Sequence, residues 1–167
     1  MEDVAVNHIR IFPIVAAATS VVVVALPADL RGEDDTMEGK VVLPDQIAWA
    51  PGPAALPPGA EAAVLYGNPG EDGLFALRLK LPAGYHIPPH THPKPEIVTV
   101  ITGTFRLGMG ETADHDGARV LPAGGFLALS PGVAHFAYAD DGTVIQLNST
   151  GPWTLTYVNP DDDPRNK

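Results

Sequence analysis

Three of the six histidines and a glutamate fall within eleven positions of the stretch GYHIPPHTHPKPEIVTVITG (84–103). Residues two apart in an extended strand point to the same side, so we expect His90 and His92 to project together. The proline-flanked turn at 93–95 then lets Glu96, which begins the next apolar run, face them. Imidazole and carboxylate are ligands of divalent transition metals. The stretch therefore predicts a metal site that needs one more ligand.

His135 is the candidate for that ligand. It ends the segment GGFLALSPGVAH (124–135), in which we expect a short strand at 126–129 and a tight turn at 130–132. A second strand beginning at His135 would return the imidazole to the wall that carries the other ligands. The competing interpretation is that these histidines are solvated or satisfied within a core and that the glutamate lies on the surface.

The spacing in the first stretch resembles the first sequence motif of the cupins. Gly84, five residues, His90, one residue, His92, three residues, Glu96, six residues and Gly103 match it at every fixed position. Five fixed positions at fixed spacing are a specific signal in a chain of this length.

A second region is similar to the second cupin motif, with two departures. Gly124, the turn at 130–132 and His135 match it, but Ser130 replaces the usual proline and Ala139 replaces the usual asparagine. Neither position holds a metal ligand in the family. The departures therefore concern the turn and the groups around the site rather than the metal.

This resemblance implies a small single-domain cupin with an RmlC-like jelly-roll β-barrel. It implies one divalent transition metal held by His90, His92, Glu96 and His135, with positions left for water and a small-molecule substrate. Iron is the leading metal, and manganese, nickel, zinc or cobalt are the alternatives, because the ligand set does not select among them.

Other residues are weaker candidates for a role at the site. Tyr85 and His86 could act as a general acid or base, and His86 could line the pocket mouth, although the surface preference of histidine favours an exposed position there. Arg78 and Lys80 alternate with leucines and could steer a carboxylate substrate, or they could simply face solvent. Gln146 could support a metal ligand.

The pattern around these residues predicts an all-β fold with little helix. From residue 41 onward, short apolar runs such as LFALRLKL and TVIQLN recur between turns rich in Gly, Pro, Asn and Asp. Such runs are typical of a sandwich or barrel built from hairpins. We expect the cupin domain at 41–160, beginning with a strand in KVVL (40–43), with an acidic connector at 29–40 and an acidic tail at 161–167.

Composition excludes several classes of partner and chemistry. The chain has 167 residues, which suits one domain, and its formal net charge of -10 disfavours nucleic acid or an anionic membrane surface as partner. The absence of cysteine excludes disulfides, a thiolate nucleophile and thiolate metal ligands. A metal must therefore bind through His, Asp and Glu.

The N-terminal segment leaves two interpretations open. Residues 1–28 end in an uncharged run, IFPIVAAATSVVVVALPA, with the length of a signal-peptide core. If it is a signal peptide, the protein is secreted or periplasmic, and otherwise we expect it in the cytoplasm. The alternative is a strand or helix buried in the domain or against a second copy. We also expect a homodimer, because a small barrel with an open sheet edge commonly covers that edge with a copy of itself.

The leading functional hypothesis is a non-haem metal-dependent dioxygenase acting on a small organic molecule that chelates the metal. One alternative is a non-redox isomerase, lyase or decarboxylase that uses the metal as a Lewis acid. The other is a non-catalytic zinc-binding sensor module, similar to the cupin domain of some anti-sigma factors.

Overall fold

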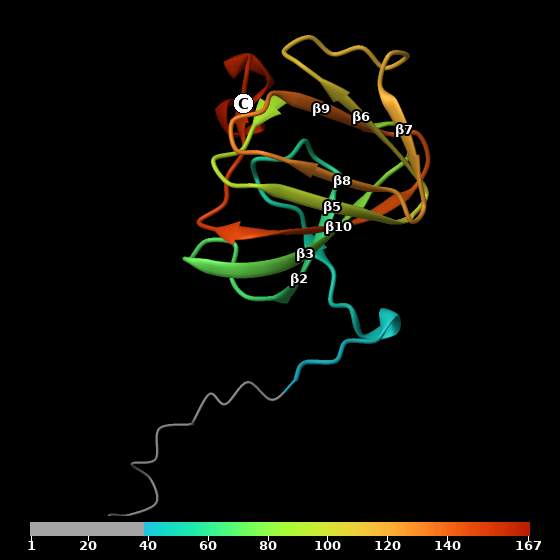
Figure 1. Ribbon diagram of the computed structural model, residues 1–167, viewed down its shortest axis with the longest axis vertical. Coiled ribbons are helices and arrows are strands. Elements are labelled where there is room, and N and C mark those ends of the chain that lie inside the picture. The colour runs from blue at the N-terminus through green and yellow to red at the C-terminus, as the bar shows by residue number, and fades with distance from the viewer. Residues whose placement is uncertain (1–38) are drawn as a thin grey trace, which may run out of the picture. The chain divides into compact units, whose positions relative to one another are not determined.

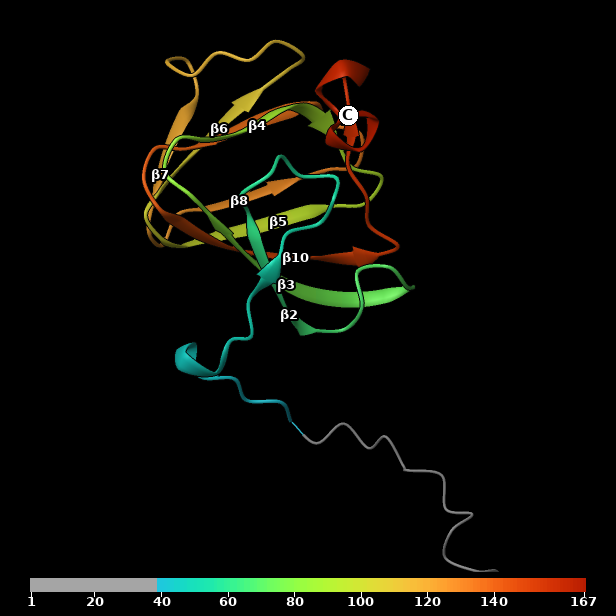
Figure 2. The ribbon, with the colours of Figure 1, turned by 180° about the vertical axis from the view of Figure 1, so that it is seen from behind.

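The computed structural model describes residues 39–167, which form two antiparallel β-sheets that face each other (Figure 1). The strands of the six-stranded sheet are, in spatial order, β1 (Ala50–Pro51), β2 (Glu61–Tyr66), β3 (Gly73–Leu81), β10 (Thr143–Gly151), β5 (Glu96–Thr102) and β8 (Phe126–Leu129). The strands of the five-stranded sheet are β11 (Thr156–Tyr157), β4 (Tyr85–Thr91), β9 (His135–Ala139), β6 (Thr104–Met109) and β7 (Arg119–Pro122). From β3 onward the chain passes repeatedly from one sheet to the other, as the view from behind also shows (Figure 2). The two layers are therefore built from interleaved strands.

The hydrophobic core lies between the two sheets. The ladder of β10 with β3 places Leu147 opposite Leu77 and Ile145 opposite Leu79, and all four side chains are buried. Phe105, on β6 of the other sheet, belongs to the same core cluster. Alternation of apolar and polar residues buries one face of each strand, and the removal of that face from water is the main force that holds the layers together.

The alternation fails in one strand that carries the candidate ligands. In β4, Tyr85 and Ile87 are buried and His86 between them is not, but after Pro88–Pro89 the inward position passes to His90. The ladder with β9 shifts register between Ile87 and His90. Proline has no N–H to donate to a ladder, so two consecutive prolines favour an irregularity at this point. The consequence is that His86 and His90 do not share a face.

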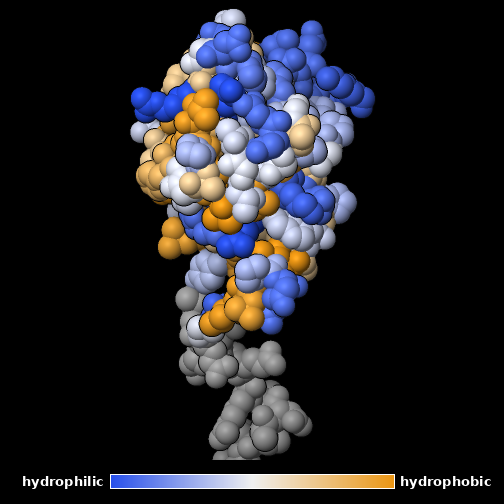
Figure 3. All heavy atoms as spheres, turned by 90° about the vertical axis from the view of Figure 1, so that its right-hand side faces the viewer, coloured by the Kyte–Doolittle hydropathy of each residue, from blue (hydrophilic) through white to orange (hydrophobic). Residues whose placement is uncertain are grey.

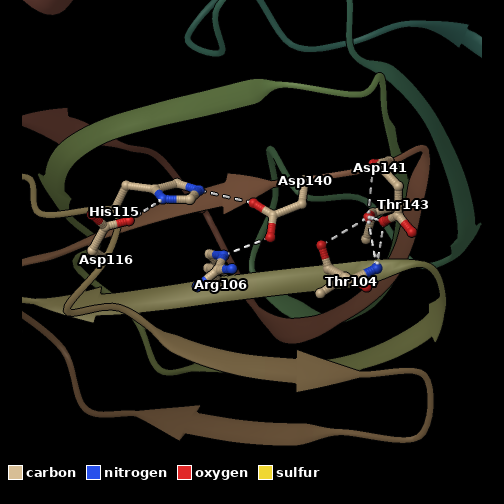
Figure 4. Close-up of polar contacts among 7 residues, drawn as sticks. All are labelled: Thr104, Arg106, His115, Asp116, Asp140, Asp141 and Thr143. Carbon is tan, nitrogen blue, oxygen red and sulfur yellow. Dashed lines mark hydrogen bonds and ion pairs between the residues drawn. The ribbon is translucent and has the colours of Figure 1, made fainter.

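The last glycine of the first motif sits in a tight connection between β5 and β6. Gly103 has a φ of 79°, and a Cβ built on it would lie 2.6 Å from Oγ1 of Thr143. In the same corner the Thr104 N–H donates to Oδ1 of Asp141 at 2.7 Å, and the Thr143 hydroxyl donates to the Thr104 carbonyl at 3.1 Å (Figure 4). Only a residue without a side chain fits this conformation and this approach.

The fold class expected from the sequence is confirmed: the described part of the chain is an all-β jelly roll. Its helical content is limited to three short 3₁₀ turns, η2 (Pro44–Gln46), η3 (Pro160–Asp162) and η4 (Pro164–Asn166). The strand expected in KVVL is wrong, because residues 41–43 have no regular structure and Val41 is 82% exposed. The segment 1–28 and most of the 29–40 connector lie outside the described residues.

On the side shown in Figure 3, hydrophobic side chains form separate patches among hydrophilic ones. Within residues 39–167, no helix has the length and apolar character needed to cross a bilayer.

Candidate metal centre

Three histidines meet inside the barrel, between the two sheets. His90 near the end of β4 lies opposite His135 at the start of β9 in the ladder, and His92 follows directly after β4. Each is only 3% exposed, and their potential ligand atoms all lie within 4.8 Å of one another. The structure therefore brings together the three histidines that the two motifs single out, and these could bind a metal ion.

Each imidazole is oriented by a backbone carbonyl. Nδ1 of His90 lies 2.7 Å from the carbonyl oxygen of Pro88, and Nδ1 of His135 lies 3.0 Å from that of Val133. A carbonyl oxygen only accepts, so both Nδ1 atoms carry the proton and donate it. Where such a ring is neutral, its Nε2 keeps the lone pair, which is the arrangement that metal-binding histidines commonly have.

His92 is oriented by a segment distant in sequence. Its Nδ1 donates to the carbonyl oxygen of Thr154 at 2.8 Å, and its ring stacks on the indole of Trp153 with centroids 4.2 Å apart and planes at 20°. Nε2 of His92 is buried and has no hydrogen-bond partner among the described residues. A buried nitrogen lone pair without a partner is costly, and a metal ion at this point would satisfy it.

Glu96 joins the histidines from the opposite sheet. It begins β5, and its Oε2 lies 3.0 Å from Nε2 of His135 while its Oε1 lies 3.7 Å from Nε2 of His92. The side chain is 12% exposed. The carboxylate therefore faces the ring nitrogens that the carbonyls leave free, as the proline-flanked turn predicts.

Burial and charge act differently on the three rings. Burial, together with the neighbouring His135 and His92, lowers the pKa of His90 to about 2. Burial also lowers the pKa of His92, against the opposing charge of Glu96. For His135 the effect of burial is outweighed by the hydrogen bond and charge of Glu96, which raise its pKa. His90 and His92 are therefore neutral, as ligands must be.

The site opens onto a small enclosed chamber, which we call the metal chamber. Its volume is about 20 Å³. Besides the four candidate ligands, its lining consists of the indole of Trp153 and apolar side chains, namely Leu56, Leu79, Ile87, Val98, Phe105, Leu107, Leu127, Ala137, Ile145, Leu147 and Leu155. Within this lining, His90, His92, Glu96 and His135 are the only residues with ionisable side chains.

The weaker candidates lie elsewhere. His86 does not line the metal chamber; its ring stacks on Tyr138 at 4.4 Å, because the irregularity at the two prolines turns it to the other side of β4. Tyr85 is buried outside the chamber lining and donates its hydroxyl to the Pro57 carbonyl. Burial raises the pKa of Tyr85, so this phenol is a poor acid or base near neutral pH. Neither residue is placed to act on a molecule at the metal.

Arg78, Lys80 and Gln146 lie on the outer face of the six-stranded sheet. Arg78 donates to Oε1 of Gln146 at 3.2 Å, and Lys80 pairs with Glu61 at 3.2 Å and lies over the ring of Trp49. Gln146 therefore does not support a metal ligand, and the two cations do not face the chamber.

A second histidine cluster involves none of the chamber residues. Nε2 of His115, in the loop after β6, lies 2.9 Å from Oδ1 of Asp140, and its Nδ1 lies 3.1 Å from Oδ1 of Asp116 (Figure 4). Arg106 donates to the other oxygen of Asp140 at 2.6 Å. These hydrogen bonds fasten the loop to β9 and β6.

Comparisons with known proteins agree with this architecture. A model of the ChrR cupin-like domain matches residues 37–154. No curated protein matches the chain. Three similar solved structures are a candidate acetylacetone dioxygenase from Methylibium petroleiphilum, the polyketide cyclase RemF from Streptomyces resistomycificus and KdgF from Halomonas.

The similarity to these structures extends over most of each chain. The Methylibium protein is 26% identical, with a TM-score of 0.57, covering 76% of this chain and 85% of that one. RemF is 17% identical, with a TM-score of 0.59 and coverages of 75% and 89%. KdgF is 21% identical, with a TM-score of 0.53 and coverages of 67% and 93%. The chain thus belongs to the cupin superfamily, within the family defined by the ChrR cupin-like domain.

Proposed function

We propose that the protein binds one divalent transition metal through His90, His92, Glu96 and His135, and that it is a dioxygenase. The substrate is a small uncharged organic molecule that chelates the metal through two oxygens. The observation that carries the proposal is the lining of the metal chamber, in which no side chain other than the four ligands is ionisable and only the Trp153 indole N–H is polar.

This lining favours chemistry done by the metal over acid–base chemistry done by side chains. An isomerase or lyase needs a positioned general acid or base besides the metal, and among the chamber residues no such group remains once the four ligands are assigned. When bound, a redox-active metal such as iron supplies the capacity to coordinate a chelating substrate and react with dioxygen.

The role of the protein residues would be to orient the metal ligands and to keep water away from the metal. Carbonyls of Pro88, Val133 and Thr154 fix the three imidazoles, and the apolar walls exclude water from the reacting atoms. The resemblance to the candidate acetylacetone dioxygenase supports a diketone as the substrate class.

A sensor without turnover is the second candidate. The matching family model is named for ChrR, and the metal chamber has a volume of only about 20 Å³, which is close to what one water requires. A closed shell around zinc would need no more space. The two candidates differ in metal and in reactivity toward dioxygen.

Metal analysis with oxygen uptake tests the proposal. The protein is purified without oxygen, its metal content is measured, and oxygen consumption is followed with acetylacetone and with phenolic chelators after loading with Fe(II). We expect one metal per chain and consumption that needs both substrate and iron. His90→Ala should abolish it, and His115→Ala, which removes a histidine outside the chamber, should not. Tightly held zinc with no uptake by the iron-loaded protein would support the sensor instead.

A further inference from the structure

A second apolar pocket adjoins the metal chamber. This outer pocket has a volume of about 420 Å³, against about 20 Å³ for the chamber. The two linings share two residues, Trp153 and Leu155. These side chains are therefore the wall between a space that is large enough for an organic molecule and one that is not.

The outer pocket is built for an uncharged occupant. Its lining includes Pro51, Pro53, Ala62 and Leu77 and contains no charged side chain. An ionised ligand would lose its hydration there without gaining a partner, whereas an apolar surface would be removed from water. The pocket chemistry thus agrees with a neutral substrate.

Trp153 connects the pocket to the metal ligands. One face of its indole stacks on His92, and its Nε1–H is buried without a hydrogen-bond partner among the described residues. A buried donor without an acceptor costs free energy that an oxygen atom of a bound molecule would recover. The indole is therefore both a barrier and a polar contact point beside the metal.

The wall segment is held at its backbone. Residues 152–155 have no regular structure, but the Trp153 N–H donates to the Pro69 carbonyl at 2.8 Å and the Leu155 carbonyl accepts from the guanidinium of Arg165 at 3.0 Å. A change of the Trp153 side-chain rotamer would join the two spaces without breaking these bonds. The indole can therefore move aside while the Thr154 carbonyl keeps its hydrogen bond to Nδ1 of His92.

We infer that the outer pocket receives the apolar part of an uncharged small molecule, and that Trp153 determines how large a molecule can reach the metal. The inference rests on the proposed function for the chelating end of that molecule. The occupancy of the pocket itself does not depend on turnover.

Fluorescence of the metal-free protein tests the pocket. The chain has two tryptophans, Trp49 and Trp153, so Trp49→Phe leaves Trp153 as the single reporter. We expect the neutral probe N-phenyl-1-naphthylamine to bind saturably and to quench Trp153. Its sulfonated counterpart, 8-anilinonaphthalene-1-sulfonate, should bind at least about tenfold more weakly, because the pocket offers no cation to its charge.

Two substitutions locate the binding. Ala62→Leu fills the outer pocket and should weaken N-phenyl-1-naphthylamine at least about tenfold, while Ala128→Leu, at an exposed position of β8 outside the pocket, should leave it unchanged. Equal binding to both variants would overturn the inference.

Size selection is read from the Co(II)-loaded protein. We expect acetylacetone to change the cobalt absorption spectrum of the wild type, and dibenzoylmethane to change it only in Trp153→Ala or Trp153→Phe. A wild-type response to dibenzoylmethane equal to that of both variants would refute the barrier. Oxygen uptake by the wild type, together with probe binding that Ala62→Leu leaves unaffected, would refute the pocket but not the dioxygenase. Probe binding that Ala62→Leu blocks, without oxygen uptake, would refute the dioxygenase but not the pocket.

Discussion

Nε2 of His135 lies 3.0 Å from Oε2 of Glu96, and this pair joins the two sheets inside the barrel. Glu96 belongs to β5 and His135 to β9, which are not neighbours in either sheet. Their pairing therefore depends on the packing of the layers rather than on a ladder. It also connects the two sequence motifs through side chains that face the same point.

Removal of His135 should weaken metal binding while leaving the other ligands in place. A ligand that binds only the folded protein at 100 times its Kd stabilises it by about 2.7 kcal/mol, so saturating Co(II) should raise the Tm of the wild type. In His135→Ala we expect the metal affinity to fall at least about tenfold and the Tm increase to shrink accordingly. The measurement is differential scanning fluorimetry across a Co(II) titration. His115→Ala is the control, and an identical shift in both variants would contradict the assignment.

Alanine at Gly103 should destabilise the barrel. The new Cβ would lie 2.6 Å from Oγ1 of Thr143 and 2.7 Å from the carbonyl oxygen of Gly142, in a residue whose φ is 79°. Overpacking typically costs about 1–3 kcal/mol and the left-handed conformation about 1–2 kcal/mol. We expect a loss of at least about 2 kcal/mol by urea denaturation. Gly142→Ala, with no atom within 4 Å of its Cβ and no positive φ, should lose much less.

Two leucines of β3 should respond differently to the same truncation. Leu77 is 3% exposed and packs in the core, so Leu77→Ala should cost about 2–5 kcal/mol of unfolding free energy. Leu74 is 70% exposed, and Leu74→Ala should change the unfolding free energy by no more than about 0.5 kcal/mol. Equal denaturation midpoints for the two variants would show that the face assignment of β3 is incorrect.

The His115 cluster should make stability depend on pH. The hydrogen bonds to Asp116 and Asp140 raise the pKa of His115 above its ordinary value, although the charge of Arg106 opposes the shift. Because the folded pKa lies above the unfolded value of about 6.5, the stabilisation is complete below that value and is lost as pH rises through the folded pKa. His115→Gln should therefore lower the Tm more at pH 6 than at pH 9. Arg119→Gln removes an exposed charge outside the cluster, and its effect should be the same at both pH values.

The clustering of the candidate ligands could be predicted because strand geometry and spacing are local. His90 and His92 share a side through simple alternation, and a turn of three residues returns Glu96 to them. The same alternation applied to His86 failed, because the ladder changes register at Pro88–Pro89. The two consecutive prolines are the feature of the sequence that indicates such a change of register.

The surroundings of the site could not be predicted from the sequence. Trp153 reaches His92 across sixty-one positions, and its neighbours in WTLTYV are those of an ordinary strand. No periodicity marks a residue whose role comes from a contact in the folded chain. Gln146 is a residue for which the sequence suggests a role that the structure does not give it. We expected it to support a metal ligand, but its side chain accepts a hydrogen bond from Arg78 on the outer face of the sheet.

The three imidazoles differ in where their orientation is encoded. Pro88 and Val133 each lie two residues before the histidine they hold, whereas Thr154 lies far along the chain from His92. If the two motifs were transplanted into an unrelated barrel, His90 and His135 would keep the carbonyls that orient them. His92 would lose its carbonyl partner, and its ring would be free to rotate. A designer who borrows this centre must bring the 152–155 segment with it.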